Sequence, residues 1–158
     1  MKAFHKRVAF LLILLGAGAM VRAQHPSEIV KWVAETGKAT ATTANVTLTA
    51  TIADGWHMYA LSQAGGGPVA LKIGVPAGSA YALKGPVPEA NATHHFDPNF
   101  NMETLYYVKS VVFNVALQGS AAAAPPSSLP IDVRFQACND RICLPPYTAH
   151  LTATGRGK

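Results

Sequence analysis

The stretch 40-TATTANVTLTATI-52 indicates the fold class, because apolar residues alternate in it with threonine. The side chains of Val46 and Leu48 fall on one face of an extended chain, and those of Thr47 and Thr49 fall on the other. A period of two in a segment rich in β-branched residues is typical of a strand with one buried face. The sequence therefore predicts a strand here that packs on a core and turns its threonines to solvent.

Similar segments recur along the chain between turns that contain glycine or proline. The predicted strands are residues 29–36, 40–52, 56–61, 69–75, 106–117, 131–137 and 147–154. In the segment 131–137, Ile131, Val133 and Phe135 are expected to face inward and Gln136 outward. Residues 85–101 are expected to form a long loop and residues 119–130 a surface excursion. Seven short strands without helical periodicity favour an all-β sandwich.

The N-terminus has the three-part layout of a secretory signal peptide, predicted here as residues 1–23. A basic start is followed by the apolar run 8-VAFLLILLGAGAMV-21 and then by small residues at a cleavage site. A membrane anchor is the weaker interpretation, since this run is shorter than the roughly 20 residues that span a bilayer. We expect an exported, periplasmic protein with one domain, residues 24–154, and a disordered tail, residues 155–158.

The charge of the mature chain argues against nucleic-acid binding. The chain has 13 Lys and Arg residues, and four of them lie in residues 1–23, leaving nine basic against eight acidic residues, a net charge of +1. No basic cluster remains to neutralise phosphates. The sequence also predicts no cofactor, because the glycine run 65–67 lacks the Lys-Ser/Thr pair of a phosphate-binding loop.

The two cysteines, Cys138 and Cys143, form the most distinctive feature of the chain. Across a hairpin tip they are expected to form either a redox-active pair or an inert structural disulfide. The short loop between them gives little entropic stabilisation, which favours the redox-active interpretation. A metal site is the third alternative; it is disfavoured because four residues separate the cysteines and His94 and His95 lie far away in the sequence.

Four segments carry a resemblance to a known family. They are 135-FQAC-138 with 143-CLPP-146, 55-GWHMY-59, 96-FDPNFNME-103, and the pair Tyr106-Tyr107 that leads into the apolar run 111–115. In this order and spacing they resemble the N-terminal periplasmic domain of DsbD-type thiol:disulfide interchange proteins. The resemblance covers about residues 30–152.

The resemblance implies an immunoglobulin-like β-sandwich with the cysteine pair at one end. It implies that Cys143 reacts with the partner and Cys138 resolves the mixed disulfide. A cap loop with an aromatic residue would shield the sulfurs; Phe100 is the best match and Phe96 the alternative. Tyr59 and His57 match positions that line the site.

The family also implies partners and a pathway. Reducing equivalents would come from a membrane-embedded disulfide reductase or a thioredoxin-like donor. They would pass to periplasmic thioredoxin-fold acceptors, such as those of cytochrome c biogenesis. The chain ends after the first domain of such proteins, so we expect its electron donor to be another protein. The competing hypothesis is a non-catalytic immunoglobulin-like binding module with a structural disulfide.

Overall fold

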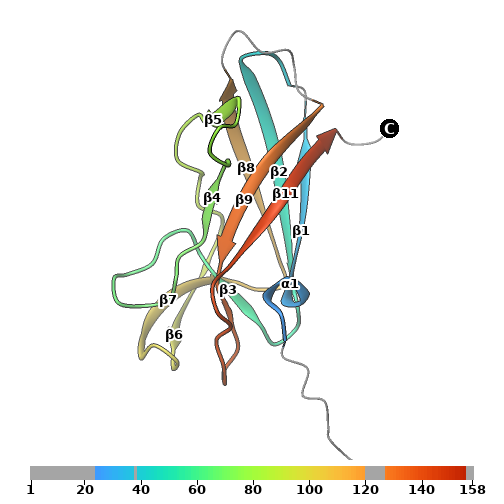
Figure 1. The fold of residues 1–158 in the computed structure, drawn as a ribbon. Coiled ribbons are helices and arrows are strands. Elements are labelled where there is room, and N and C mark those ends of the chain that lie inside the picture. Colours follow the sequence, from blue (N-terminus) through green and yellow to red (C-terminus); the bar gives the residue numbers. More distant parts are fainter. Residues whose placement is uncertain (1–23, 38, 120–126, 156–158) are drawn as a thin grey trace, which may run out of the picture.

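The structure is a computed structural model that describes residues 24–37, 39–119 and 127–155 (Figure 1). Most of these residues lie in strands, and the predicted signal peptide lies outside the described residues. The elements are α1 (Pro26–Ile29), β1 (Val30–Thr36), β2 (Thr43–Ile52), β3 (His57–Tyr59), β4 (Lys72–Gly74), β5 (Tyr81–Leu83), β6 (Thr93–Asp97), β7 (Met102–Tyr107), β8 (Ser110–Gly119), β9 (Ser128–Phe135), β10 (Ala137–Cys138) and β11 (Tyr147–Gly155). In the described part of the chain, no helix is long and apolar enough to cross a membrane.

The strands form two sheets of an immunoglobulin-like β-sandwich, as predicted. The larger sheet has the order β4-β9-β11-β1-β2-β8-β5, and the smaller has the order β10-β3-β7-β6. Strands β1 and β11 run parallel to each other, and the other described pairings are antiparallel. In the smaller sheet, β10, which contains Cys138, pairs with β3.

The larger sheet curls. Six residues separate β4 from β5, although these strands form its two edges. A backbone of that length reaches about 25 Å at most, whereas the edges of a flat seven-stranded sheet lie about 29 Å apart. The edges must therefore approach one another, and Figure 1 shows β4 and β5 along the same side of the molecule.

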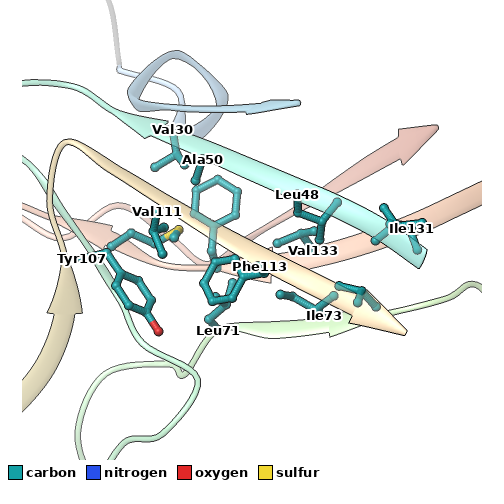
Figure 2. Packing of buried hydrophobic residues seen from close by; sticks show 14 of the residues in the cluster. Val30, Leu48, Ala50, Leu71, Ile73, Tyr107, Val111, Phe113, Ile131 and Val133 are labelled. Carbon is teal, nitrogen blue, oxygen red and sulfur yellow. The ribbon is translucent and has the colours of Figure 1, made fainter. Parts of the chain in front are cut away.

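The core fills the space inside this curl (Figure 2). In β2 the predicted alternation is confirmed, since Val46, Leu48 and Ala50 are buried whereas the intervening threonines are half-buried or exposed. In β9 the predicted inward residues are fully buried. Phe113 of β8 lies between the two sheets, against the ring of Tyr107 in β7. The strand faces therefore follow the sequence pattern.

Two predicted segments were wrong because the chain changes sheets within them. Residues 85–101 were expected to be a loop, but they contain β6, which pairs with β7. Residues 106–117 were expected to be one strand, but the chain leaves β7 after Tyr107 and enters β8 of the other sheet at Ser110. Lys109 takes a left-handed conformation, with φ of 60°, at this break.

Strands β9 and β11 extend beyond the predicted ends, and a third strand was not predicted. Strand β9 begins at Ser128, inside the expected surface excursion, of which residues 120–126 lie outside the described residues. Pro130 fits this strand because β4 pairs only with residues 132–134, so β9 has one neighbouring strand at Pro130. Strand β11 reaches Gly155, the first residue of the predicted tail, and β5 was not predicted at all.

Candidate functional site

The cysteine hairpin begins where the chain crosses from β9 to β10. Gln136, at the crossing, was predicted to face outward but is only 9% exposed. Its side-chain oxygen accepts a hydrogen bond from the Val69 N–H at 2.8 Å, and its amide nitrogen donates to the Leu144 carbonyl at 3.3 Å. A buried amide needs such partners. Gln136 therefore fixes the exit of the hairpin against the body of the domain.

Cys138 and Cys143 form a disulfide, with Cα atoms 4.1 Å apart. The hairpin between them is closed by a hydrogen bond from the Asn139 N–H to the Ile142 carbonyl at 2.9 Å. The Asn139 side-chain oxygen accepts the N–H groups of Arg141 and Ile142, both at 2.9 Å. Cys138 is fully buried, whereas Cys143 is half-buried. The pairing predicted from the sequence is confirmed, and Cys143 is the sulfur that is more open to solvent.

Three polar side chains gather beside Cys143. The Tyr59 hydroxyl lies 3.9 Å from the Cys143 sulfur and donates a hydrogen bond to Asp97 Oδ2 at 2.5 Å. His57 Nε2 lies 3.3 Å from the same hydroxyl and 3.6 Å from the same carboxylate oxygen. The Asn99 N–H donates to Asp97 Oδ1 at 2.8 Å. The Tyr59 hydroxyl therefore contacts both the buried carboxylate of Asp97 and the Cys143 sulfur.

The charges of this cluster follow from its contacts. Burial opposes ionisation of Asp97, but hydrogen bonds from Tyr59 and the Asn99 N–H, with His57 nearby, keep its pKa below the ordinary value. Burial lowers the pKa of His57, and this effect exceeds the opposing attraction to Asp97. Burial and the bond to Asp97 raise the pKa of Tyr59. Near neutral pH the cluster therefore holds an ionised carboxylate, a protonated phenol and a mainly neutral imidazole.

The turn between β6 and β7 approaches the cysteine hairpin. Both project at the same end of the molecule (Figure 1). The Asn99 side-chain amide donates to the Asn139 carbonyl at 3.0 Å. The half-buried ring of Phe100 packs edge-on against Tyr59, with ring centres 5.9 Å apart. Phe96 is 47% exposed on β6. The structure thus brings Phe100, rather than Phe96, beside Tyr59.

Asp97 lies in the site but was not among the site residues predicted from the sequence. It is 2% exposed and bonded to Tyr59, although the two are 38 positions apart in the sequence. The sequence Asp-Pro-Asn signals the local turn, in which the carboxylate caps the Asn99 N–H. Nothing in that local pattern reveals the approach to Tyr59.

The adjacent histidines His94 and His95 are exposed, but they lie on β6 and not on a loop. His94 pairs with Glu103 at 3.1 Å, and the His95 ring lies 5.8 Å from that of Tyr106. Within residues 24–37, 39–119 and 127–155, no group of three or more His, Cys, Asp or Glu side chains is placed to hold a metal ion.

The sequence model of the family described as "Thiol:disulfide interchange protein DsbD, N-terminal" matches residues 26–154. No curated protein matches the chain. The N-terminal periplasmic domain of ScsB from Proteus mirabilis has a similar fold, with a TM-score of 0.60 and 19% identity over 84% of this chain and 49% of that one. The chain thus spans about half the length of that structure, and at this identity the likeness concerns the fold alone.

Two structures from Neisseria meningitidis align less closely. The reduced N-terminal domain of DsbD has a TM-score of 0.49 and 21% identity, over 85% of this chain and 91% of that one. The complex between the DsbD N-terminal and PilB N-terminal domains gives a TM-score of 0.45 and 21% identity, over 86% and 91%.

Proposed function

This chain belongs to the family of DsbD N-terminal domains, and we propose that it works as a thiol–disulfide exchange domain through Cys138 and Cys143. The observation that carries the proposal is the position of the disulfide in a short hairpin at one end of the sandwich, with one sulfur buried and the other half-buried. A disulfide in such a short loop restricts the unfolded chain little. A purely stabilising role therefore explains its placement poorly.

The reaction assigns one role to each sulfur. In the reduced domain, the thiolate of Cys143 attacks one sulfur of a partner disulfide, and the partner's second sulfur leaves as a thiolate that takes up a proton. The thiolate of Cys138 then attacks the Cys143 sulfur. A Cys138–Cys143 bond forms and the mixed disulfide breaks, releasing the partner as a dithiol. The domain loses two electrons and two protons, and the partner gains them.

The turn between β6 and β7, here called the cap turn, would regulate access to Cys143. Phe100 packs on Tyr59, and Asn99 ties the turn to the cysteine hairpin. Opening would break both contacts, which lie at the end of the β6–β7 hairpin. In this proposal Phe100 is the covering residue, Phe96 is free to touch a partner, and Tyr59 and His57 line the site.

The proposed setting is the periplasm, reached through the signal peptide 1–23. The donor would be a membrane-embedded disulfide reductase or a thioredoxin-like protein. The acceptors would be periplasmic thioredoxin-fold proteins, including those of cytochrome c biogenesis. The family match supports this setting.

The first test is the reduction potential of the cysteine pair, measured by equilibrating residues 24–155 in glutathione or dithiothreitol buffers and counting free thiols. We expect a value between about −120 and −270 mV, the range of exchange proteins. A value below about −300 mV marks a structural disulfide and would favour the binding-module alternative.

A second test separates the roles of the two sulfurs. The Cys138→Ser variant keeps the half-buried Cys143 thiol and is expected to form a mixed disulfide with oxidised glutathione. The Cys143→Ser variant keeps only the buried Cys138 and is expected to react much more slowly. Equal rates for the two variants would contradict the assignment.

A further inference from the structure

His57 occupies an unusual position beside the disulfide. In the ladder between β3 and β10 it lies directly opposite Cys138. Its side chain is 13% exposed. The imidazole lies against the Tyr106 ring, with ring centres 4.6 Å apart, and contacts Tyr59 through Nε2. The imidazole of His57, which can gain or lose a proton, therefore lies within the exchange site.

The charged and titratable groups around His57 come from several other parts of the chain. Asp97, the last residue of β6, is the closest, and Asp140 of the cysteine hairpin also favours the protonated imidazole. His95 of β6 and burial oppose it. Asp54 and Lys109 line the pocket of about 250 Å³ that His57 shares with Asp140. Of all these groups, Asp97 alone bonds directly to the hydroxyl that faces Cys143.

The charge state of His57 decides the net charge next to the sulfur. With a neutral imidazole, the ionised Asp97 gives the cluster one negative charge, which opposes a thiolate at Cys143. With a protonated imidazole, the cluster is neutral and this opposition disappears. The tyrosine hydroxyl links the three groups, since it lies 3.3 Å from His57 Nε2, 2.5 Å from Asp97 Oδ2 and 3.9 Å from the Cys143 sulfur.

We propose that His57 is a positioning residue of the exchange site, whose protonation, balanced against Asp97 through Tyr59, controls how readily the Cys143 thiol loses its proton. The proposal rests on the exchange function and names a residue that sets its pH dependence. The proton that leaves Cys143 passes to solvent, and no sulfur–sulfur bond changes in this step. The resulting thiolate is the species that attacks the partner.

The size of the effect follows from the distance between the charges. His57 Nε2 and the Cys143 sulfur contact the same hydroxyl, so they lie no more than about 7 Å apart. At an effective dielectric constant of about 20, a positive charge at this distance increases the thiolate fraction of Cys143 by roughly tenfold to a hundredfold. Because Cys143 is half-buried, solvent screening favours the lower end. Protonation of His57 is therefore expected to increase the thiolate fraction of Cys143 by roughly tenfold.

The test is the rate at which iodoacetamide alkylates reduced Cys143 between pH 4.5 and 10, with mass spectrometry locating the label. An isolated thiol loses about tenfold in rate for each pH unit below its pKa. In the wild-type domain we expect a shallower fall where His57 gains its proton. The His57→Gln variant keeps a hydrogen-bonding side chain but no charge. Its rate is expected to equal that of wild type above pH 8 and to be roughly tenfold lower at pH 4.5.

His94→Gln is the matched control, because His94 is exposed on the same sheet and pairs with Glu103; it should follow wild type at every pH. The coupling would be overturned if the ratio of the wild-type alkylation rate to the His57→Gln rate did not change with pH. It would also be overturned if the wild-type rate followed the titration of one group only. Alkylation involves no partner protein. A shallow wild-type profile in a domain whose cysteine pair has the reduction potential of a structural disulfide would thus contradict the exchange function while supporting the coupling.

Discussion

Removing the Tyr59 hydroxyl tests whether the buried cluster stabilises the fold as its geometry implies. In the Tyr59→Phe variant, Asp97 loses the donor at 2.5 Å and keeps the Asn99 N–H at 2.8 Å. A hydrogen bond to a charged group contributes about 1.5–3 kcal/mol. Because the carboxylate is 2% exposed, water cannot readily replace the lost donor. We expect the free energy of unfolding of the oxidised domain to fall by about 2 kcal/mol at pH 7.

The pH dependence of this loss has a defined sign. The pKa of folded Asp97 lies below its ordinary value of 3.8. Its ionised form therefore contributes stability that is fully present above the unfolded pKa and is lost as the pH falls through the folded pKa. Tyr59→Phe removes one cause of the low pKa, so the difference between variant and wild type should be constant from pH 7 to pH 5. It should shrink below about pH 4.

The assay is urea unfolding followed by tryptophan fluorescence at pH 7, 5, 4 and 3. Tyr106→Phe is the control, because within the described residues the Tyr106 hydroxyl makes no hydrogen bond although its ring lies at the same site. That variant should lose less than about 0.5 kcal/mol. Equal losses for the two variants, or a Tyr59→Phe loss that does not change between pH 7 and pH 3, would refute the reasoning.

Three further experiments test the cysteine hairpin and the turn that covers it. Phe100→Ala should increase several-fold the rate at which a bulky maleimide labels reduced Cys143, while Phe96→Ala, which removes an exposed ring, should leave this rate unchanged. Gln136→Ala leaves the half-buried N–H of Val69 and the buried carbonyl of Leu144 without their partner and should cost about 2 kcal/mol in urea unfolding. A loss below about 0.5 kcal/mol would show that water replaces the amide. The double variant C138S/C143S should lose about 2 kcal/mol or less, because the closed loop is short. A loss near 5 kcal/mol would favour a structural disulfide.

The strand faces were predictable because they depend on neighbours in the sequence. Val46 and Leu48 are buried and Thr47 and Thr49 are less so, as the alternation predicts. The boundary between β7 and β8 was not predictable, since Tyr107 and Val111 are both buried and both suit a strand. Only their partners differ, and the partners of a strand lie far away along the chain.

Gln136 shows the same limit within a strand pattern. Its position predicts an outward side chain, yet the chain crosses between sheets there, so the amide turns inward to two backbone groups. An alternating pattern holds only while a strand stays in one sheet. A buried glutamine is possible at this point because the crossing leaves backbone groups that need partners.

The sequence by itself determined the all-β class, the buried faces of the long strands and the cysteine pairing. The pairing is a local matter, since five positions separate Cys138 from Cys143 and a turn lies between them. No local pattern placed side chains around Cys143; the family resemblance implied His57 and Tyr59, and the tertiary structure alone brought Asp97 to them. His57 and Tyr59 come from β3 and Asp97 from the end of β6; these two strands lie on opposite sides of β7, which pairs with both. Contacts of this kind depend on how sheets assemble, which no local pattern encodes.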